Sequence, residues 1–160
     1  MSDRSDCPGS GSFHRPVATF RLAFKGEVMS VRRALRDVSD WLGQQGIGPS
    51  HRGTVQIVMA EVLNNIVEHA YFGTGAGPIA LLISDCSTGL AVRVSDKGGP
   101  MPGGRLPDGT TPDGNHPGAM NEGGYGWLLI RTLADDLHYE RSGTCNKLSF
   151  LLPLRGDRRE

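Results

Sequence analysis

The sequence predicts an α+β two-layer sandwich, in which a mixed, mostly antiparallel sheet is covered on one face by three helices. Three observations support this fold class. Short alternating segments occur in adjacent pairs joined by tight turns, three longer segments have helical spacing of apolar residues, and one long glycine-rich stretch precedes the last of these. Strands joined by hairpins pair antiparallel. A chain of 160 residues fits one domain with its own core.

The first half of the chain is predicted to contain a strand and two helices. Residues 17–24 alternate between apolar and polar positions, which indicates a half-buried strand. Apolar residues then recur at steps of three and four over 27–42, the pattern of an amphipathic helix. After a break rich in glycine at 43–49, the same spacing predicts a second helix over 51–71.

The second half is predicted to contain two hairpins around a long loop and a helix. Four short segments are the predicted strands, 78–84 paired with 90–96 and 137–141 paired with 146–154. Between the hairpins, residues 97–124 and Gly126 contain ten of the 23 glycines and no apolar periodicity. A loop of this length in a compact domain is usually a lid, a binding loop or disordered. Helical spacing returns over 125–137.

Composition limits the classes of protein to which the chain can belong. Seventeen basic and 17 acidic residues give no electrostatic indication of nucleic-acid or membrane binding. No apolar run reaches the length of a transmembrane helix, and the N-terminus lacks the apolar centre of a signal peptide. The three cysteines form no CxxC pair and are expected to be reduced, as in a cytoplasmic protein. We expect a disordered tail at 1–15, one domain at 16–155 and a polar tail at 156–160.

Three polar residues, Glu61, Asn65 and His69, recur every four positions within the otherwise apolar second helix. Residues at this spacing stay within about 80° of one another on a helix, so the three side chains line one edge. The line is either an exposed stripe beside the core or a set of ligand contacts. A carboxylate and an amide oxygen one turn apart suit Mg²⁺, which takes few protein ligands besides waters and phosphates. A glutamate beside bound phosphates can instead deprotonate a nucleophile.

Two further motifs lie at predicted element boundaries. Residues 96–99, Asp-Lys-Gly-Gly, follow a strand, where the carboxylate can accept a hydrogen bond from an exocyclic amine while the glycines let a flat ligand approach. A plain turn is the alternative. Residues 123–126, Gly-Gly-Tyr-Gly, open the last helix, where backbone amides form an anion site or, without a ligand, a hinge. Neither the P-loop pattern nor the Rossmann pattern is present.

Taken in order, the three motifs resemble the N, G1 and G2 boxes of the GHKL ATPases, which share the Bergerat ATP-binding fold. The N box is similar to residues 61–71, the G1 box to 96–99, and the G2 box to 124–136. The resemblance covers about residues 17 to 153. Within the superfamily, the chain resembles the RsbW-type and SpoIIAB-type anti-sigma factors, which are serine/threonine protein kinases.

This resemblance implies ATP and Mg²⁺ as cofactors and gives the polar helix edge a function. Asn65 would hold Mg²⁺, and Glu61 would be the catalytic base that takes the proton from the acceptor serine. Residues 99–123 would form the ATP lid. For His69 and Tyr71, which also match the family pattern, we expect packing at the helix end.

The remaining nucleotide contacts are also implied by the resemblance. Asp96 would bind the adenine amino group, and Gly98 would let the ring approach. Gly124 and Gly126 would wrap around the triphosphate. Thr144, which precedes the last strand, would add a contact near the adenine.

The function that the resemblance implies is that of a serine protein kinase and anti-sigma factor in a partner-switching system. Its expected partners are a STAS-domain anti-anti-sigma protein, which it would phosphorylate, and a sigma factor or another response regulator target. Relatives of this kind are often homodimers, and an exposed edge on the first strand would permit the same here. Arg32, Arg33 and Arg36 on the first helix form either a docking face or a solvated surface.

One departure from the family pattern affects the expected chemistry. Several relatives carry an arginine just before the G2 glycines, whereas this chain has Asn121-Glu122-Gly123. Lys97 or Arg105 would have to supply the cation, and a positioned cation changes phosphoryl-transfer rates by orders of magnitude. The alternative function is therefore a catalytically weak or inactive nucleotide-binding module that sequesters a regulatory partner. A third interpretation is the same fold without any nucleotide.

Overall fold

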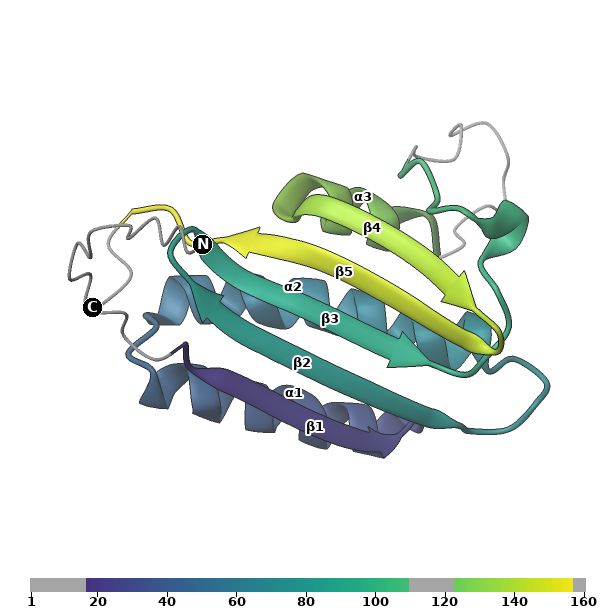
Figure 1. The fold of residues 1–160 in the computed structure, drawn as a ribbon. Coiled ribbons are helices and arrows are strands. Elements are labelled where there is room, and N and C mark those ends of the chain that lie inside the picture. Colours follow the sequence, from purple (N-terminus) through teal and green to yellow (C-terminus); the bar gives the residue numbers. More distant parts are fainter. Residues whose placement is uncertain (1–16, 110–122, 157–160) are drawn as a thin grey trace, which may run out of the picture.

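The computed structural model describes residues 17–109 and 123–156, which form a five-stranded sheet with helices packed on one face (Figure 1). The strands are β1 (Thr19–Lys25), β2 (Pro78–Cys86), β3 (Gly89–Asp96), β4 (Asp135–Ser142) and β5 (Cys145–Pro153). The helices are α1 (Val28–Gln44), α2 (Pro49–Asn65) and α3 (Gly123–Leu133), with a π-helical turn η1 (Ile66–Ala70) and a 3₁₀ turn η2 (Pro102–Gly104). The expected α+β two-layer sandwich is confirmed.

The strand order in the sheet is β1-β2-β3-β5-β4. All four pairings are antiparallel, so the sheet is antiparallel throughout rather than mostly so. The segment after β3 leads through α3 to the far edge of the sheet, and the hairpin of β4 and β5 then returns the chain to β3 (Figure 1). The ends of β3 and β5 are thereby brought side by side, with Asp96 opposite Asn146.

The core lies between one face of the sheet and the helices. Strand residues alternate between this face and the open face; along β5, every second side chain is buried. The largest fully buried side chains come from both layers: Leu42, Met59, Leu63, Ile79, Ile83, Leu90, Ile130 and Leu152. Burying one such side chain contributes about 1.5–3 kcal/mol. The core therefore fixes the helices against the sheet.

The ends of two helices differ from those predicted from apolar spacing. The second helix begins at Pro49 and is α-helical only to Asn65, after which η1 continues as a π-helix, with the Tyr71 amide donating to the Ile66 carbonyl at 3.0 Å. α3 ends at Leu133, four residues before the predicted end, because β4 already begins at Asp135. No helix within the described ranges is long and apolar enough to cross a membrane.

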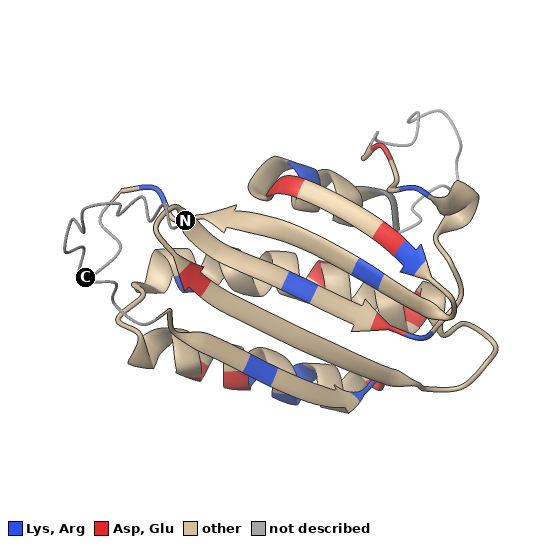
Figure 2. Ribbon diagram, viewed as in Figure 1, with Lys and Arg blue, Asp and Glu red and all other residues tan. Residues whose placement is uncertain are grey.

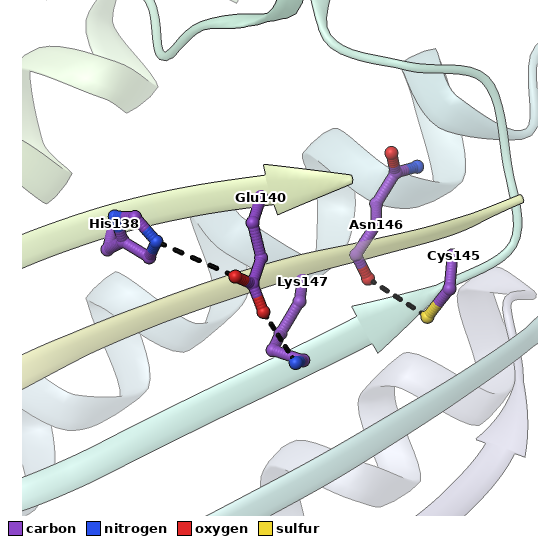
Figure 3. Close-up of polar contacts among 5 residues, drawn as sticks. All are labelled: His138, Glu140, Cys145, Asn146 and Lys147. Atoms are coloured by element: carbon purple, nitrogen blue, oxygen red, sulfur yellow. Dashed lines mark hydrogen bonds and ion pairs between the residues drawn. The ribbon is translucent and has the colours of Figure 1, made fainter. Parts of the chain in front are cut away.

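The face of the sheet opposite the helices carries charged and polar side chains together with apolar ones such as Ala80, Leu82 and Leu151. Basic residues lie on β1, β3 and β5 (Figure 2). Between β4 and β5, Lys147 Nζ donates to Glu140 Oε1 at 2.6 Å, and His138 Nε2 lies 3.8 Å from Glu140 Oε2 (Figure 3). The hydrogen bond from Lys147 lowers the pKa of the Glu140 carboxyl. These charged groups are exposed, whereas the buried polar residues Asp96 and Asn146 belong to the helix-covered face.

Tyr71 joins the end of η1 to two strands. Its hydroxyl donates to the Pro78 carbonyl at 2.6 Å and accepts from the Lys97 amide at 2.9 Å. The ring fills the space beside Gly77, where a Cβ would overlap it. Burial raises the pKa of the Tyr71 hydroxyl. The packing role predicted for Tyr71 is confirmed.

We predict that Tyr71→Phe lowers the free energy of unfolding by about 1–3 kcal/mol, since the ring remains but the Lys97 amide and the Pro78 carbonyl lose their partner. Urea denaturation measures the change. Tyr125→Phe is the matched control, because Tyr125 is 54% exposed. Equal stability of the two variants would contradict the bridging role of the Tyr71 hydroxyl.

Candidate functional site

A cavity of about 480 Å³ lies between the end of α2, the ends of β3 and β5, α3 and the loop that follows β3. Its volume is within the range of about 300–1,000 Å³ that is usual for small-molecule sites. Most of its lining is apolar: Val62, Ile66, Ala70, Phe72, Pro100, Met101, Pro102, Pro107, Trp127 and Leu148. The polar side chains in the lining are Asn65, His69, Asp96, Tyr139 and Asn146. An apolar cavity with few polar groups suits a flat ligand that carries specific hydrogen-bonding groups.

Asp96 is the last residue of β3 and is only 6% exposed. Its Oδ1 accepts hydrogen bonds from the Gly98 amide and from Asn146 Nδ2, both at 2.8 Å. A buried carboxylate is tolerated when such donors satisfy it. Among the described residues no hydrogen bond reaches Oδ2, which leaves that oxygen to accept one from a ligand.

Asn65 lies where α2 changes into the π-helix η1, and its side chain lines the cavity. Its Nδ2 is buried and has no hydrogen-bond partner among the described residues. Native proteins rarely leave a buried amide unpaired, so the arrangement indicates a polar ligand. Of the two atoms of this amide, it is the oxygen rather than the nitrogen that suits a magnesium ion. π-Helical turns are also frequent at functional sites.

Glu61 lies one turn before Asn65 and is directed at α3 rather than at the cavity lining. A Cβ on Gly126 would lie only 2.5 Å from Glu61 Oε2, so a larger residue there would displace the carboxylate from this position. Gly124 and Gly126 both belong to the first turn of α3. The structure therefore brings the carboxylate and the glycine-rich helix start together, as a base beside an anion site would require.

Gly98 packs against the end of η1, where there is no room for a side chain. A Cβ at this position would overlap the Ala70 carbonyl and would lie 2.7 Å from the Ala70 Cβ. The next amide, that of Gly99, donates to the Ala70 carbonyl at 2.6 Å. Gly99 lines the cavity, while Gly98 is buried behind it. The structure thus gives Gly98 a packing function, while its expected role in letting a ring approach stays a prediction.

The residue of the last hairpin that reaches Asp96 is Asn146, which sequence reasoning missed. Thr144 is exposed in the turn between β4 and β5 and is not part of the cavity lining. Asn146 lies on the buried face of β5, in line with Leu148, Phe150 and Leu152. A polar residue within this apolar alternation was the available indication in the sequence.

The other predicted residues lie around the cavity or outside the described ranges. His69 is exposed and lines the cavity, so it is not confined to helix-end packing. Lys97 and Arg105 are exposed and do not line it. Asn121 and Glu122 lie outside the described residues, as does most of the predicted lid at 99–123.

Comparison with known proteins supports the same fold. The family model described as Histidine kinase-like ATPase domain matches residues 24–152. The RsbU and RsbW domains of Rv1364c from Mycobacterium tuberculosis share the fold with a TM-score of 0.59 and 14% identity, over 91% of this chain but only 35% of that one. The histidine kinase domain of the blue-light activated histidine kinase EL346 from Erythrobacter litoralis matches 79% of this chain and 60% of its own, with a TM-score of 0.45 and 22% identity. A search of curated proteins found no match.

We predict that Gly98→Ala lowers the free energy of unfolding by about 1–3 kcal/mol, because its methyl group would force the loop away from Ala70. Gly99→Ala is the control, since its Cβ would meet the Ala70 carbonyl at an ordinary 3.6 Å. Chemical denaturation of both variants checks the difference. Similar losses in the two would show that the close approach at Gly98 is unimportant.

Proposed function

The chain belongs to the family of histidine kinase-like ATPase domains, and from this premise we propose that it is an ATP·Mg-dependent serine protein kinase and anti-sigma factor. In this proposal it acts in a partner-switching system, phosphorylates a STAS-domain anti-anti-sigma protein and alternately holds a sigma factor or another regulatory target. The observation that carries the proposal is one cavity lined by Asn65 and Asp96, with Glu61 adjoining it at the start of α3.

The cavity fits a purine nucleotide at its Asp96 end. The Oδ2 atom of Asp96 would accept a hydrogen bond from the adenine amino group, while the apolar lining contacts the flat ring. Trp127 of α3 and Met101 of the loop after β3 contribute to that lining. The adenine would thus exchange water for apolar contacts on entering the cavity.

The phosphates would lie toward Asn65 and the start of α3. Asn65, whose buried amide lacks a partner among the described residues, would hold Mg²⁺. When bound, the ion offsets the negative charge that develops on the transferred phosphate. The amides of Gly124 and Gly126 at the start of α3 would bind phosphate oxygens.

Glu61 is proposed to act as the catalytic base. Its carboxylate lies against Gly126, beside the proposed phosphate site. It would accept the proton of the acceptor serine hydroxyl, which makes that oxygen a better nucleophile. The glycine at 126 keeps this position open for the carboxylate.

A second candidate function is a catalytically weak or inactive nucleotide-binding module that sequesters its partner. It is favoured because neither Lys97 nor Arg105, the two candidate cations for phosphoryl transfer, lines the cavity. In either case we place the protein in the cytoplasm, without direct contact to nucleic acid or membrane. β1 is an edge strand of the sheet, which would permit pairing with a second copy.

Replacing Asn65 by alanine tests the proposed magnesium ligand. We predict that calorimetric titration of Asn65→Ala with ATP shows no gain in affinity on adding Mg²⁺, whereas the wild type gains. Asn64→Ala is the control, because Asn64 is exposed on the same helix. A normal Mg²⁺ dependence in Asn65→Ala would remove Asn65 as the ligand.

Replacing Glu61 by glutamine tests the catalytic role. We predict a loss of phosphotransfer from γ-labelled ATP to the STAS partner of about 100-fold or more, the usual contribution of a general base, with ATP affinity largely kept. Glu68→Gln on the exposed side of η1 is the control and keeps the wild-type rate. Absence of label transfer by the wild type itself would select the non-catalytic function.

A further inference from the structure

Asn146 is a buried amide on a face of β5 that is otherwise apolar. Its side chain is 5% exposed and lies between strand β3 and the cavity. Figure 3 shows its amide on the other side of β5 from Lys147, which belongs to the open face. A polar side chain buried in this way costs free energy unless every hydrogen-bonding group is used.

The protein itself uses all of the hydrogen-bonding capacity of this amide. Asn146 Nδ2 donates to Asp96 Oδ1 at 2.8 Å and to the Gly99 carbonyl at 2.9 Å. Asn146 Oδ1 accepts from the Tyr139 hydroxyl and from Arg141 Nη1, both at 2.7 Å. The amide therefore needs no ligand for itself, and its effect on a ligand passes through Asp96.

The two donors on Oδ1 also fix which way the amide points. If the amide were turned over, its Nδ2 would face the hydrogens of Tyr139 and Arg141, and its Oδ1 would face the Asp96 carboxylate. Both contacts would be repulsive, so the orientation with Nδ2 toward Asp96 is the stable one.

We propose that Asn146 is a positioning residue that makes the cavity select a base with an exocyclic amine; this inference rests on the proposed nucleotide-binding function. Asn146 and the Gly98 amide both occupy Oδ1 of Asp96, which holds the plane of the carboxylate and leaves Oδ2 as a pure acceptor. An amine on the base donates to Oδ2. A keto oxygen in the same place would meet another acceptor and be rejected.

The test compares ATP with inosine triphosphate, which carries a keto oxygen where ATP carries the amine. Calorimetric titration of the wild type should show ATP preferred by about 10- to 100-fold, the worth of one hydrogen bond to a charged group. In Asn146→Leu the Asp96 carboxylate is held only by the Gly98 amide, and we expect the ratio of the two dissociation constants to fall at least about fivefold. If Asn146 had only a structural role, the variant would bind both nucleotides more weakly by the same factor. An unchanged ratio of the two dissociation constants would therefore overturn the proposal.

A second variant keeps the test independent of folding. Arg141 is exposed and does not line the cavity, so Arg141→Ala removes one of the two donors that orient the amide without opening the core. In Arg141→Ala the ratio of the two dissociation constants should fall by a smaller factor than in Asn146→Leu. An unchanged ratio would contradict the inference. Ser149→Ala, two positions along from Lys147 on the open side of β5, is the control and keeps the wild-type ratio.

The outcomes separate this inference from the proposed function. If the wild type binds neither nucleotide, the proposed function fails and the inference fails with it. If the wild type prefers ATP and Asn146→Leu keeps that preference, nucleotide binding stands and only the positioning role of Asn146 is overturned.

Discussion

The constraint on which the site depends is the buried carboxylate of Asp96. A carboxylate that is 6% exposed must be hydrogen-bonded to the protein, and its donors come from the loop after β3 and from β5. Asn146 extends the network to Gly99 and to Tyr139, whose hydroxyl also accepts from the Met101 amide at 3.1 Å. Three strands and the loop after β3 are thus joined around one carboxylate, and the cavity forms beside it.

α2 is required to serve both the core and the cavity. One side of it contributes Met59 and Leu63, which are fully buried, while Asn65 lies at the cavity. The helix then widens into η1, and Gly98 approaches Ala70 so closely that no side chain fits between them. Packing at the helix end therefore limits where the loop after β3 can run.

The two ends of the site differ in physical character, which separates binding from transfer. Around Asp96, hydrogen bonds within the protein hold the polar groups in place beside apolar lining, so this part suits recognition of a base. The end at Glu61 and Gly126 adjoins the start of α3, where backbone amides and a carboxylate lie together. Nucleotide binding draws on the first end, whereas phosphotransfer also requires charge compensation at the second. The same fold can therefore serve a kinase or a sequestering module.

The sequence by itself determined the order of the elements and the two-layer fold, because these follow from local periodicity and turn signals. That Asp96 and Asn65 approach one cavity was implied by the resemblance to the GHKL boxes. It did not determine that Asn146 rather than Thr144 would contact Asp96, since that depends on the register between β3 and β5. The π-helical end of α2, the early end of α3 and the close contact between Gly98 and Ala70 were likewise decided by tertiary packing. Each depends on residues distant in the chain, and local patterns carry no information on which distant backbone will lie opposite.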